Sequence, residues 1–272
     1  MIRKVTDTKQ VKPLFDGWEE TMIWSCLQGV MGDLYADYSG DAADSSKISR
    51  SEAAKAVLGD FVFLAGKPSK ELLLYRPPCK AEKKEEFQIL VPRDADWERL
   101  IKKVYGSRAE RITRYAIQKE PDAWDGKGRE RLQEMVSALP EGYELRLIDQ
   151  ELYDQCRQQE WSRDLVSQFP DYETYQKWGL GTAALHGKRL VCGASSYSRY
   201  LEGIEIEIDT REDYRRKGLA RACAARLILE CLDRGLYPSW DAHTEISAEL
   251  AEKLGYHRGE EYTAYLLMGS RK

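Results

Sequence analysis

Residues 204–221 read Ile-Glu-Ile-Glu-Ile-Asp-Thr-Arg-Glu-Asp-Tyr-Arg-Arg-Lys-Gly-Leu-Ala-Arg, and the fold can be inferred from this stretch. Its first six residues alternate strictly, with Ile204, Ile206 and Ile208 on one face and carboxylates on the other. A period of two predicts a strand with one buried face. Apolar residues then recur at intervals of four from 219 to 231, which predicts a long helix. A basic turn that contains a glycine joins the two elements.

The basic turn has the properties of an anion site. A helix N-terminus carries unpaired backbone N–H groups and about half a positive charge from its dipole, and both favour phosphate. Gly218 lets the main chain approach a diphosphate closely, and the small Ala220 avoids a clash. The surrounding basic side chains are those of Arg215, Arg216, Lys217 and Arg221. The alternative interpretation is that 215–221 is only a solvated helix start.

The composition of the 272 residues disfavours several classes of protein. With 42 basic and 46 acidic side chains, the formal net charge is −4 and the pI is about 5.7, so a nucleic-acid partner is not expected. A hydrophobic content of 42% indicates a globular chain. No apolar run approaches the roughly 18 residues of a membrane span. Because the N-terminal residues also lack the apolar core of an export signal, we expect a cytoplasmic protein without membrane contact.

Cysteines and histidines are too dispersed for a metal centre. The six cysteines show no CxxC spacing, and only three histidines occur. We therefore expect reduced thiols and no metal. Signatures of other enzyme classes fail as well, since Gly179-Leu-Gly181 lacks the third glycine of a dinucleotide fingerprint and the sequence contains no P-loop or serine-hydrolase elbow.

The remaining patterns predict two domains separated at Pro140-Glu-Gly142. The prediction is an N-terminal α+β domain over 1–140 and a C-terminal domain over 141–272. The first domain is predicted to contain a helix over 11–35, a hairpin of strands at 61–64 and 72–75, a strand at 87–91, and helices beginning at 94 and 129. The second is predicted to contain strands at 143–148, 182–185, 189–195, 204–209, 238–242 and 262–268, and helices around 161–178, 219–235 and 247–254.

Two motifs together carry a family resemblance. The pattern Arg-x-x-Gly-x-Ala at 215–220, placed between a strand and a long helix, resembles the acetyl-coenzyme A pyrophosphate signature of the GCN5-related N-acetyltransferases (GNAT superfamily). The segment 247–256 is similar to that superfamily's helix ending in a Lys-x-Gly-aromatic turn. These motifs cover about 143–268. The whole chain resembles, more loosely, bacterial acetyltransferases that carry an N-terminal extension.

The resemblance implies a fold and an activity. The fold would be a mixed central sheet flanked by helices (α+β or α/β), preceded by a smaller α+β domain. The activity would be transfer of acetyl from acetyl-CoA to a primary amine of a small molecule by direct attack on the thioester. The superfamily's strand before the glycine turn splays from its neighbour and binds the pantetheine arm. The implied cofactor-binding residues are Ile208, Asp209, Thr210, Arg215, Arg216, Lys217, Gly218, Leu219, Ala220 and Arg221, with the backbone N–H near Ile208 stabilising the oxyanion.

An attacking ammonium must first lose a proton, so the reaction needs a base. Glu205 and Glu207 lie on the implied strand, and distance from the turn favours Glu205, although a bulge would change which face each occupies. The alternative is that both carboxylates face solvent or pair with lysines. Many relatives have a Tyr general acid where this chain has Ala251, so Tyr256, Ser247 or water would have to take that role.

Two other functions stay open at this point. One is a non-catalytic regulator that binds acyl-CoA, which the replacement at Ala251 makes plausible. The other is an interaction protein that retains the fold without the cofactor. The aromatic residues Trp18 and Trp24 have three interpretations: a wall of the acceptor site, a homodimer contact, or core packing, which is the default.

Overall fold

The computed structural model describes residues 1–38, 51–77 and 87–267. The chain forms two compact units: Met1–Arg114 together with the C-terminal segment from Tyr262, and Tyr115–Glu261. The predicted boundary at residue 140 does not coincide with either division. The reason is that helix α5 (Lys127–Ser137) buries Leu132 in the same apolar cluster as helix α8 (Leu219–Asp233), so residues 115–140 pack with the second unit.

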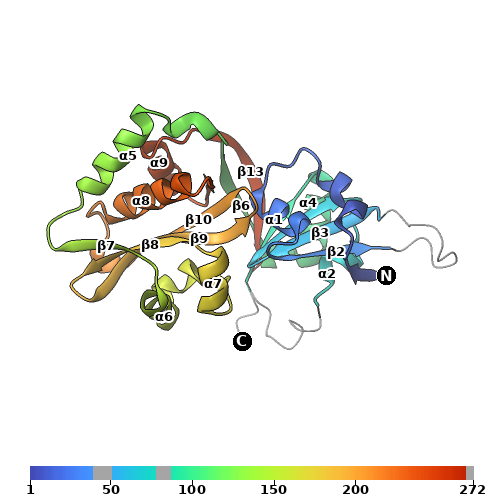
Figure 1. Cartoon of the computed structure of the whole chain (residues 1–272). Coiled ribbons are helices and arrows are strands. Elements are labelled where there is room, and N and C mark those ends of the chain that lie inside the picture. Colours follow the sequence, from blue (N-terminus) through green and yellow to red (C-terminus); the bar gives the residue numbers. More distant parts are fainter. Residues whose placement is uncertain (39–50, 78–86, 268–272) are drawn as a thin grey trace. The chain divides into compact units, whose positions relative to one another are not determined.

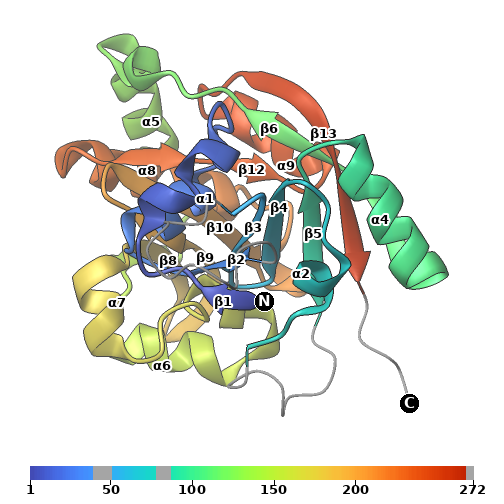
Figure 2. The same ribbon diagram turned by 90° about the vertical axis from the view of Figure 1, so that its right-hand side faces the viewer.

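The first unit is built on a mostly antiparallel sheet (Figures 1 and 2). Neighbouring strands follow the order β1 (Ile2–Lys4), β2 (Asp33–Asp37), β3 (Ala53–Leu58), β4 (Phe61–Gly66), β5 (Gln88–Pro92) and β13 (Arg258–Leu267). Only β4 and β5 pair in parallel within this set. One face is covered by α2 (Lys70–Leu74) and α4 (Ala95–Tyr105), whose buried Leu72 and Trp97 share a cluster with Leu64 of β4.

The predicted helix over 11–35 is wrong. The segment instead contains a 3-10 helix (Lys12–Phe15), the short helix α1 (Thr21–Gln28) and strand β2. Gly29 ends α1 in a left-handed conformation, with φ of 69°. The apolar residues with this spacing, among them Phe15, Met22 and Leu34, are buried from three separate elements rather than from one helical face. Within this unit the ring of Trp18 packs edge-on against that of Phe63, with 5.7 Å between the ring centroids. This contact supports the core-packing interpretation of Trp18.

The predicted strand at 72–75 is also wrong, because 70–74 form helix α2. Ser69 caps this helix by accepting a hydrogen bond from the Leu72 N–H at 3.2 Å. A short apolar run cannot be assigned to strand or helix by periodicity alone, and here the cap decides. The hairpin partner of β4 is β3, which the sequence analysis missed. In contrast, the strand at 87–91 is confirmed as β5, and the helix after Asp94 is confirmed as α4, with Asp94 as its cap.

The second unit contains a five-stranded sheet in the order β11-β10-β9-β8-β7. The strands are β7 (Tyr143–Leu147), β8 (Gly181–His186), β9 (Arg189–Tyr200), β10 (Gly203–Thr210) and β11 (Tyr237–Ser239). Only the β10–β11 pair is parallel. Figure 1 shows α5 and α8 on one side of this sheet, and α6 (Gln150–Gln158) and α7 (Tyr172–Trp178) on the other. The predicted mixed sheet flanked by helices is confirmed.

Three further elements complete the second unit or run through its boundary. Strand β6 (Ala109–Ile117) passes from the first unit into the second, and β12 (Asp241–Ala242) pairs with it. Helix α9 (Glu245–Lys253) follows β12. The single strand predicted at 238–242 is therefore two strands, β11 and β12, which belong to different sheets. Throughout the described residues, every helix is too short or too polar to span a membrane.

Candidate functional site

Strands β10 and β11 pair over only three residues of each strand and then separate. Gly203, Ile204 and Glu205 pair with Tyr237, Pro238 and Ser239, and β11 then ends. The chain turns at Trp240 and enters β12, which pairs with β6. Residues 206–210 stay paired with β9, but among the described residues no strand pairs with their other side. Within the described residues, the second unit thus has a free strand edge over residues 206–210, directly after Glu205.

A β-bulge lies at the same point. Glu205 is opposite Ser198, whereas Ile206 is opposite Ser196, so Tyr197 of β9 is the extra residue. Because the insertion is in β9, the alternation along β10 survives. Ile204 and Ile206 are both buried in the apolar cluster beneath α8, as the period of two predicts.

Glu205 is a buried carboxylate at the base of the free edge. It is 5% exposed, which excludes the solvent-facing interpretation for this residue. The negative charge of Glu205 affects buried tyrosines nearby. Burial, together with the negative charges of Glu120 and Glu205, raises the pKa of Tyr237 to about 12. The Tyr200 hydroxyl, which also feels this charge, shares a hydrogen bond of 2.9 Å with Ser239. Glu205 therefore lies in a low-dielectric environment, where gain or loss of a proton changes the electrostatic energy strongly.

Glu207 occupies the next position on the same face and is half-buried. Its Oε1 accepts a hydrogen bond of 3.2 Å from the backbone N–H of Ile208. This N–H is the donor that the sequence analysis assigned to the oxyanion. The carboxylate of Glu207 therefore occupies the N–H that the resemblance assigns to the oxyanion.

The side chain of Asp209, one of the implied cofactor-binding residues, is half-buried and has a shifted pKa. Burial, reinforced by the negative charge of Asp164, raises the pKa of Asp209 to about 6, and Arg215 opposes this shift. The register explains the approach of the second carboxylate. Asp209 is opposite Gly193, where a Cβ would lie 2.5 Å from a methyl carbon of Leu165, so the 3-10 helix Glu160–Leu165 packs directly on the sheet. A strand glycine was the available signal for this close approach.

We expect Asp209→Asn to stabilise the protein at neutral pH. The folded-state pKa lies above the unfolded value, so the native carboxyl binds its proton more tightly and wild-type stability falls as pH rises from about 4 to about 6. The amide removes this loss, which is on the order of 2 kcal/mol at pH about 7.5 after allowance for partial exposure, and changes little at pH about 3.5. Urea unfolding at both pH values measures the difference. Asp213→Asn, at an exposed carboxylate, is the control; equal gains in the two variants would contradict the assignment.

The turn before α8 has the backbone geometry of an anion cradle. Arg216 and Gly218 both adopt positive φ, 61° and 79°. Turns with left-handed residues are typical of the concavities in which backbone N–H groups bind anions. Gly218 is the N-cap of α8, and in the described chain no side chain caps it. A Cβ at Gly218 would meet no heavy atom within 4 Å, so the space before the glycine is open. The Nε of Arg215 donates to the Thr210 carbonyl at 3.3 Å and ties the turn to the end of β10.

The predicted diphosphate residues differ in what they expose. The side chains of Arg215, Arg216, Lys217 and Arg221 are exposed. Leu219 is buried in the apolar cluster beneath α8, and Ala220 packs against that cluster, so these two residues present only backbone groups to a ligand. The anion cradle is thus a main-chain surface surrounded by exposed cationic side chains, a combination suited to phosphate oxygens.

The two side chains considered as general acids, Tyr256 and Ser247, differ in their exposure to solvent. Tyr256 is buried, and its hydroxyl donates to the Pro238 carbonyl at 2.6 Å, while burial raises its pKa further. It therefore acts as part of the core. Ser247 is half-exposed and accepts a hydrogen bond of 3.1 Å from Trp240. Ala251 is fully buried in the cluster beneath α8.

The cysteines of the described chain behave as core residues. All five are unbridged and buried, and burial raises the pKa of Cys156 and of Cys231 to about 12. Such thiols are poor nucleophiles at neutral pH. Within the same residues no group of three or more His, Cys, Asp or Glu side chains is arranged to hold a metal ion.

The comparison with protein families decides the identity. A model described as GNAT acetyltransferase matches residues 12–265, which include most of both units. This chain belongs to the GNAT acetyltransferase family. It is therefore an acetyltransferase by family, and the resemblance inferred from the two motifs is confirmed. The match also extends through the N-terminal unit, so the GNAT family model includes the region predicted as an extension.

Individual relatives agree with this assignment. A GCN5-related N-acetyltransferase-like protein from Streptococcus suis is 48% identical, with 95% of this chain and 97% of that chain covered and a TM-score of 0.82. An uncharacterized N-acetyltransferase of Bacillus subtilis, YdfB, is 28% identical over 284 residues, which cover 97% of this chain and 98% of the relative. A tandem GNAT protein from the clavulanic acid biosynthesis pathway is 11% identical, with 100% of this chain and 99% of that chain covered and a TM-score of 0.54. At this identity the similarity shows a shared fold alone.

Proposed function

We propose that this protein transfers an acetyl group from acetyl-CoA to the primary amine of a small molecule. The observation that carries the proposal is the continuity between the free edge of β10, residues 206–210, and the anion cradle at 215–218. A free strand edge hydrogen-bonds an extended amide-bearing chain as an added strand would. The main-chain N–H groups of the cradle suit a diphosphate. One elongated ligand with both chemical parts matches this arrangement.

The residues that would hold acetyl-CoA follow from this placement. Ile208, Asp209 and Thr210 offer backbone groups to the pantetheine arm, and 215–221 offer N–H groups and cationic side chains to the diphosphate. The open space at Gly218 fits such a ligand. When bound, acetyl-CoA supplies a thioester carbonyl that an amine can attack and a thiol of ordinary acidity as the leaving group.

Glu205 is the proposed proton acceptor. It lies where β10 and β11 separate, so an amine bound at that opening could pass its proton to the carboxylate directly or through one water. The N–H of Ile208 would donate to the carbonyl oxygen as negative charge develops on it. For that contact to form, the carboxylate of Glu207 has to leave the N–H that it covers.

Glu207→Ala is expected to lower the KM for acetyl-CoA by about threefold while kcat is retained, since removal of a competing hydrogen bond is worth roughly 0.5–1 kcal/mol. Steady-state kinetics with a saturating amine measures both constants. A kcat that falls, and falls more at neutral than at high pH, would instead make Glu207 the base and contradict the assignment to Glu205.

The regulator and the interaction protein are separated from the enzyme by two assays. Release of coenzyme A is measured across a panel of amines, and calorimetry measures the heat of acetyl-CoA binding. The proposed enzyme binds and turns over. A regulator, which the buried Ala251 at the expected acid position would suit, binds without turnover with any amine, and an interaction protein produces no heat.

A further inference from the structure

The first unit contains a lysine in its apolar core. Lys55 lies in the middle of β3, is 4% exposed, and is paired across the sheet with Tyr35 of β2 and Leu64 of β4. Side chains directly opposite one another share a face, so Lys55 lies among the buried residues beneath α2. A charged amine in such surroundings is costly unless an opposite charge compensates it.

The described surroundings of Lys55 lack that compensation. Its Nζ donates to the backbone carbonyl of Tyr75 at 2.6 Å and lies 5.7 Å from the centre of the Tyr75 ring. Within residues 1–38, 51–77 and 87–267 no carboxylate forms an ion pair with Lys55. The neighbouring charge is that of Arg76, which has the same sign. Burial, and then this repulsion, lowers the pKa of Lys55 to about 7.

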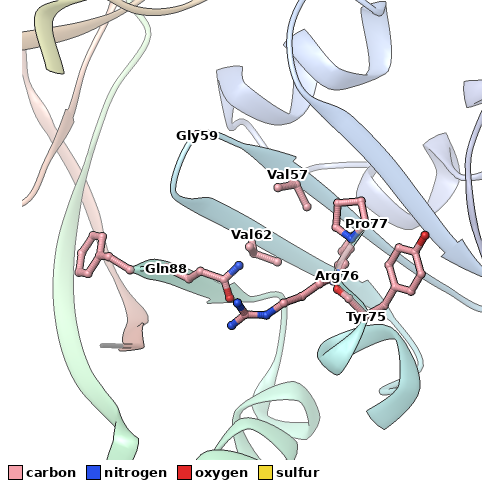
Figure 3. A pocket seen from close by; sticks show the side chains of 9 residues that line it. Val57, Gly59, Val62, Tyr75, Arg76, Pro77 and Gln88 are labelled. Atoms are coloured by element: carbon pink, nitrogen blue, oxygen red, sulfur yellow. Dashed lines mark hydrogen bonds between the residues drawn. The ribbon is translucent and has the colours of Figure 1, made fainter. Parts of the chain in front are cut away.

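Lys55 and Arg76 line a pocket in this unit (Figure 3). Figure 3 shows the side chains of Arg76 and Gln88 pointing toward one another, and both residues line the pocket. Val57, Val62 and Pro77 supply apolar lining. The pocket therefore combines two cationic groups and an amide with an apolar wall, and lies outside the residues 203–221 assigned to acetyl transfer.

We propose that this pocket binds a small organic carboxylate, with the carboxylate on Lys55 and Arg76 and the hydrocarbon part against Val57 and Val62. The guanidinium of Arg76 suits two carboxylate oxygens, and a buried ammonium gains most from an anion that replaces its lost hydration. A monoanion with a short apolar chain matches this lining better than a dianion, whose desolvation costs more. The site does not depend on the acetyl-transfer proposal.

Binding should depend on pH because the anion favours the charged amine. Among the described residues, the polar side chains that pair with Lys55 or line the pocket with it are those of Tyr35 on β2, Tyr75 and Arg76 after α2, and Gln88 on β5. Asp33, further along β2, is engaged by Lys4 and by the Tyr35 hydroxyl. Protonated Lys55 predominates below its native pKa. Carboxylate binding is therefore tighter at pH about 6 than at pH about 8.5.

The test uses the full chain, with hexanoate, inorganic phosphate and chloride at matched ionic strength as probes. Calorimetry is expected to show hexanoate binding at least tenfold tighter at pH about 6 than at about 8.5, with a parallel rise in melting temperature. Arg76→Gln, at a half-buried side chain, and Lys55→Met should each weaken binding about tenfold or more. Lys67→Met, at an exposed lysine of the same unit, should not.

Three results would overturn the site. Hexanoate could fail to bind the wild-type chain, could bind Arg76→Gln as tightly as the wild type, or could act no better than phosphate or chloride. Because Arg76→Gln leaves the core unchanged, the proposal stays testable even if Lys55→Met folds poorly. Since calorimetry uses no acetyl-CoA, failure here leaves the proposed acetyl transfer unaffected.

Discussion

Gly218→Trp is expected to abolish detectable acetyl-CoA binding while the protein remains folded. The indole would project into the open space before the N-terminus of α8, where the diphosphate is proposed to lie. Loss of several main-chain hydrogen bonds to a charged group predicts a rise in Kd of at least about 100-fold. Calorimetry with acetyl-CoA measures the affinity, and circular dichroism checks the fold.

Gly235→Trp is the matched control for this variant. Gly235 follows the other end of α8, has a φ of 65°, and also has open space where a Cβ would lie. Both substitutions force a bulky residue into the left-handed region at a cost of about 1–2 kcal/mol, so both should lower stability similarly. Unchanged affinity in Gly218→Trp, or equal losses in the two variants, would refute the anion cradle.

Glu205→Gln is expected to reduce kcat by about 100-fold at neutral pH and much less at high pH. The amide preserves the shape of the buried side chain but cannot accept a proton. As pH rises, the amine substrate loses its own proton in solution and the need for a base disappears. A pH profile of kcat and kcat/KM for the variant and the wild type measures this recovery.

Glu202→Gln controls for charge removal near the same strand, since Glu202 is exposed in the turn before β10. It should retain the wild-type rate and pH profile. A loss in Glu205→Gln that is the same at every pH would assign Glu205 a structural role, and the proton acceptor would then have to be sought at Glu207 or Asp209.

Helices and strands were predicted correctly where the local sequence pattern came from a single element. The alternation of 204–209 and the four-residue spacing after Leu219 each encode one face of one element, and both are confirmed. The region 11–35 failed because apolar residues of three different elements happened to be spaced like one helix. Strand β3 was missed because its Ala-Ala-Lys-Ala run carries little pattern, and its burial comes from pairing with β2 and β4.

For the candidate site, the turn was predictable and the electrostatics were not. Gly218 and its basic neighbours are contiguous in the chain, so the anion cradle can be predicted from the sequence alone. The raised pKa of Asp209 depends on its burial and then on the charge of Asp164, which lies 45 positions earlier and is brought near by packing of a 3-10 helix over Gly193. No periodicity links two such residues.

The sequence alone determined the family, the strand–turn–helix unit and the residues of the anion cradle, because these depend on neighbours within about 20 positions. Only the tertiary structure decided where β11 ends, which carboxylate is buried at the free edge, and that Lys55 lies in an apolar core beside Arg76. Those properties arise from burial and from charges contributed by distant segments. Desolvation and Coulomb energies depend on positions in space, and strand pairing and packing set those positions.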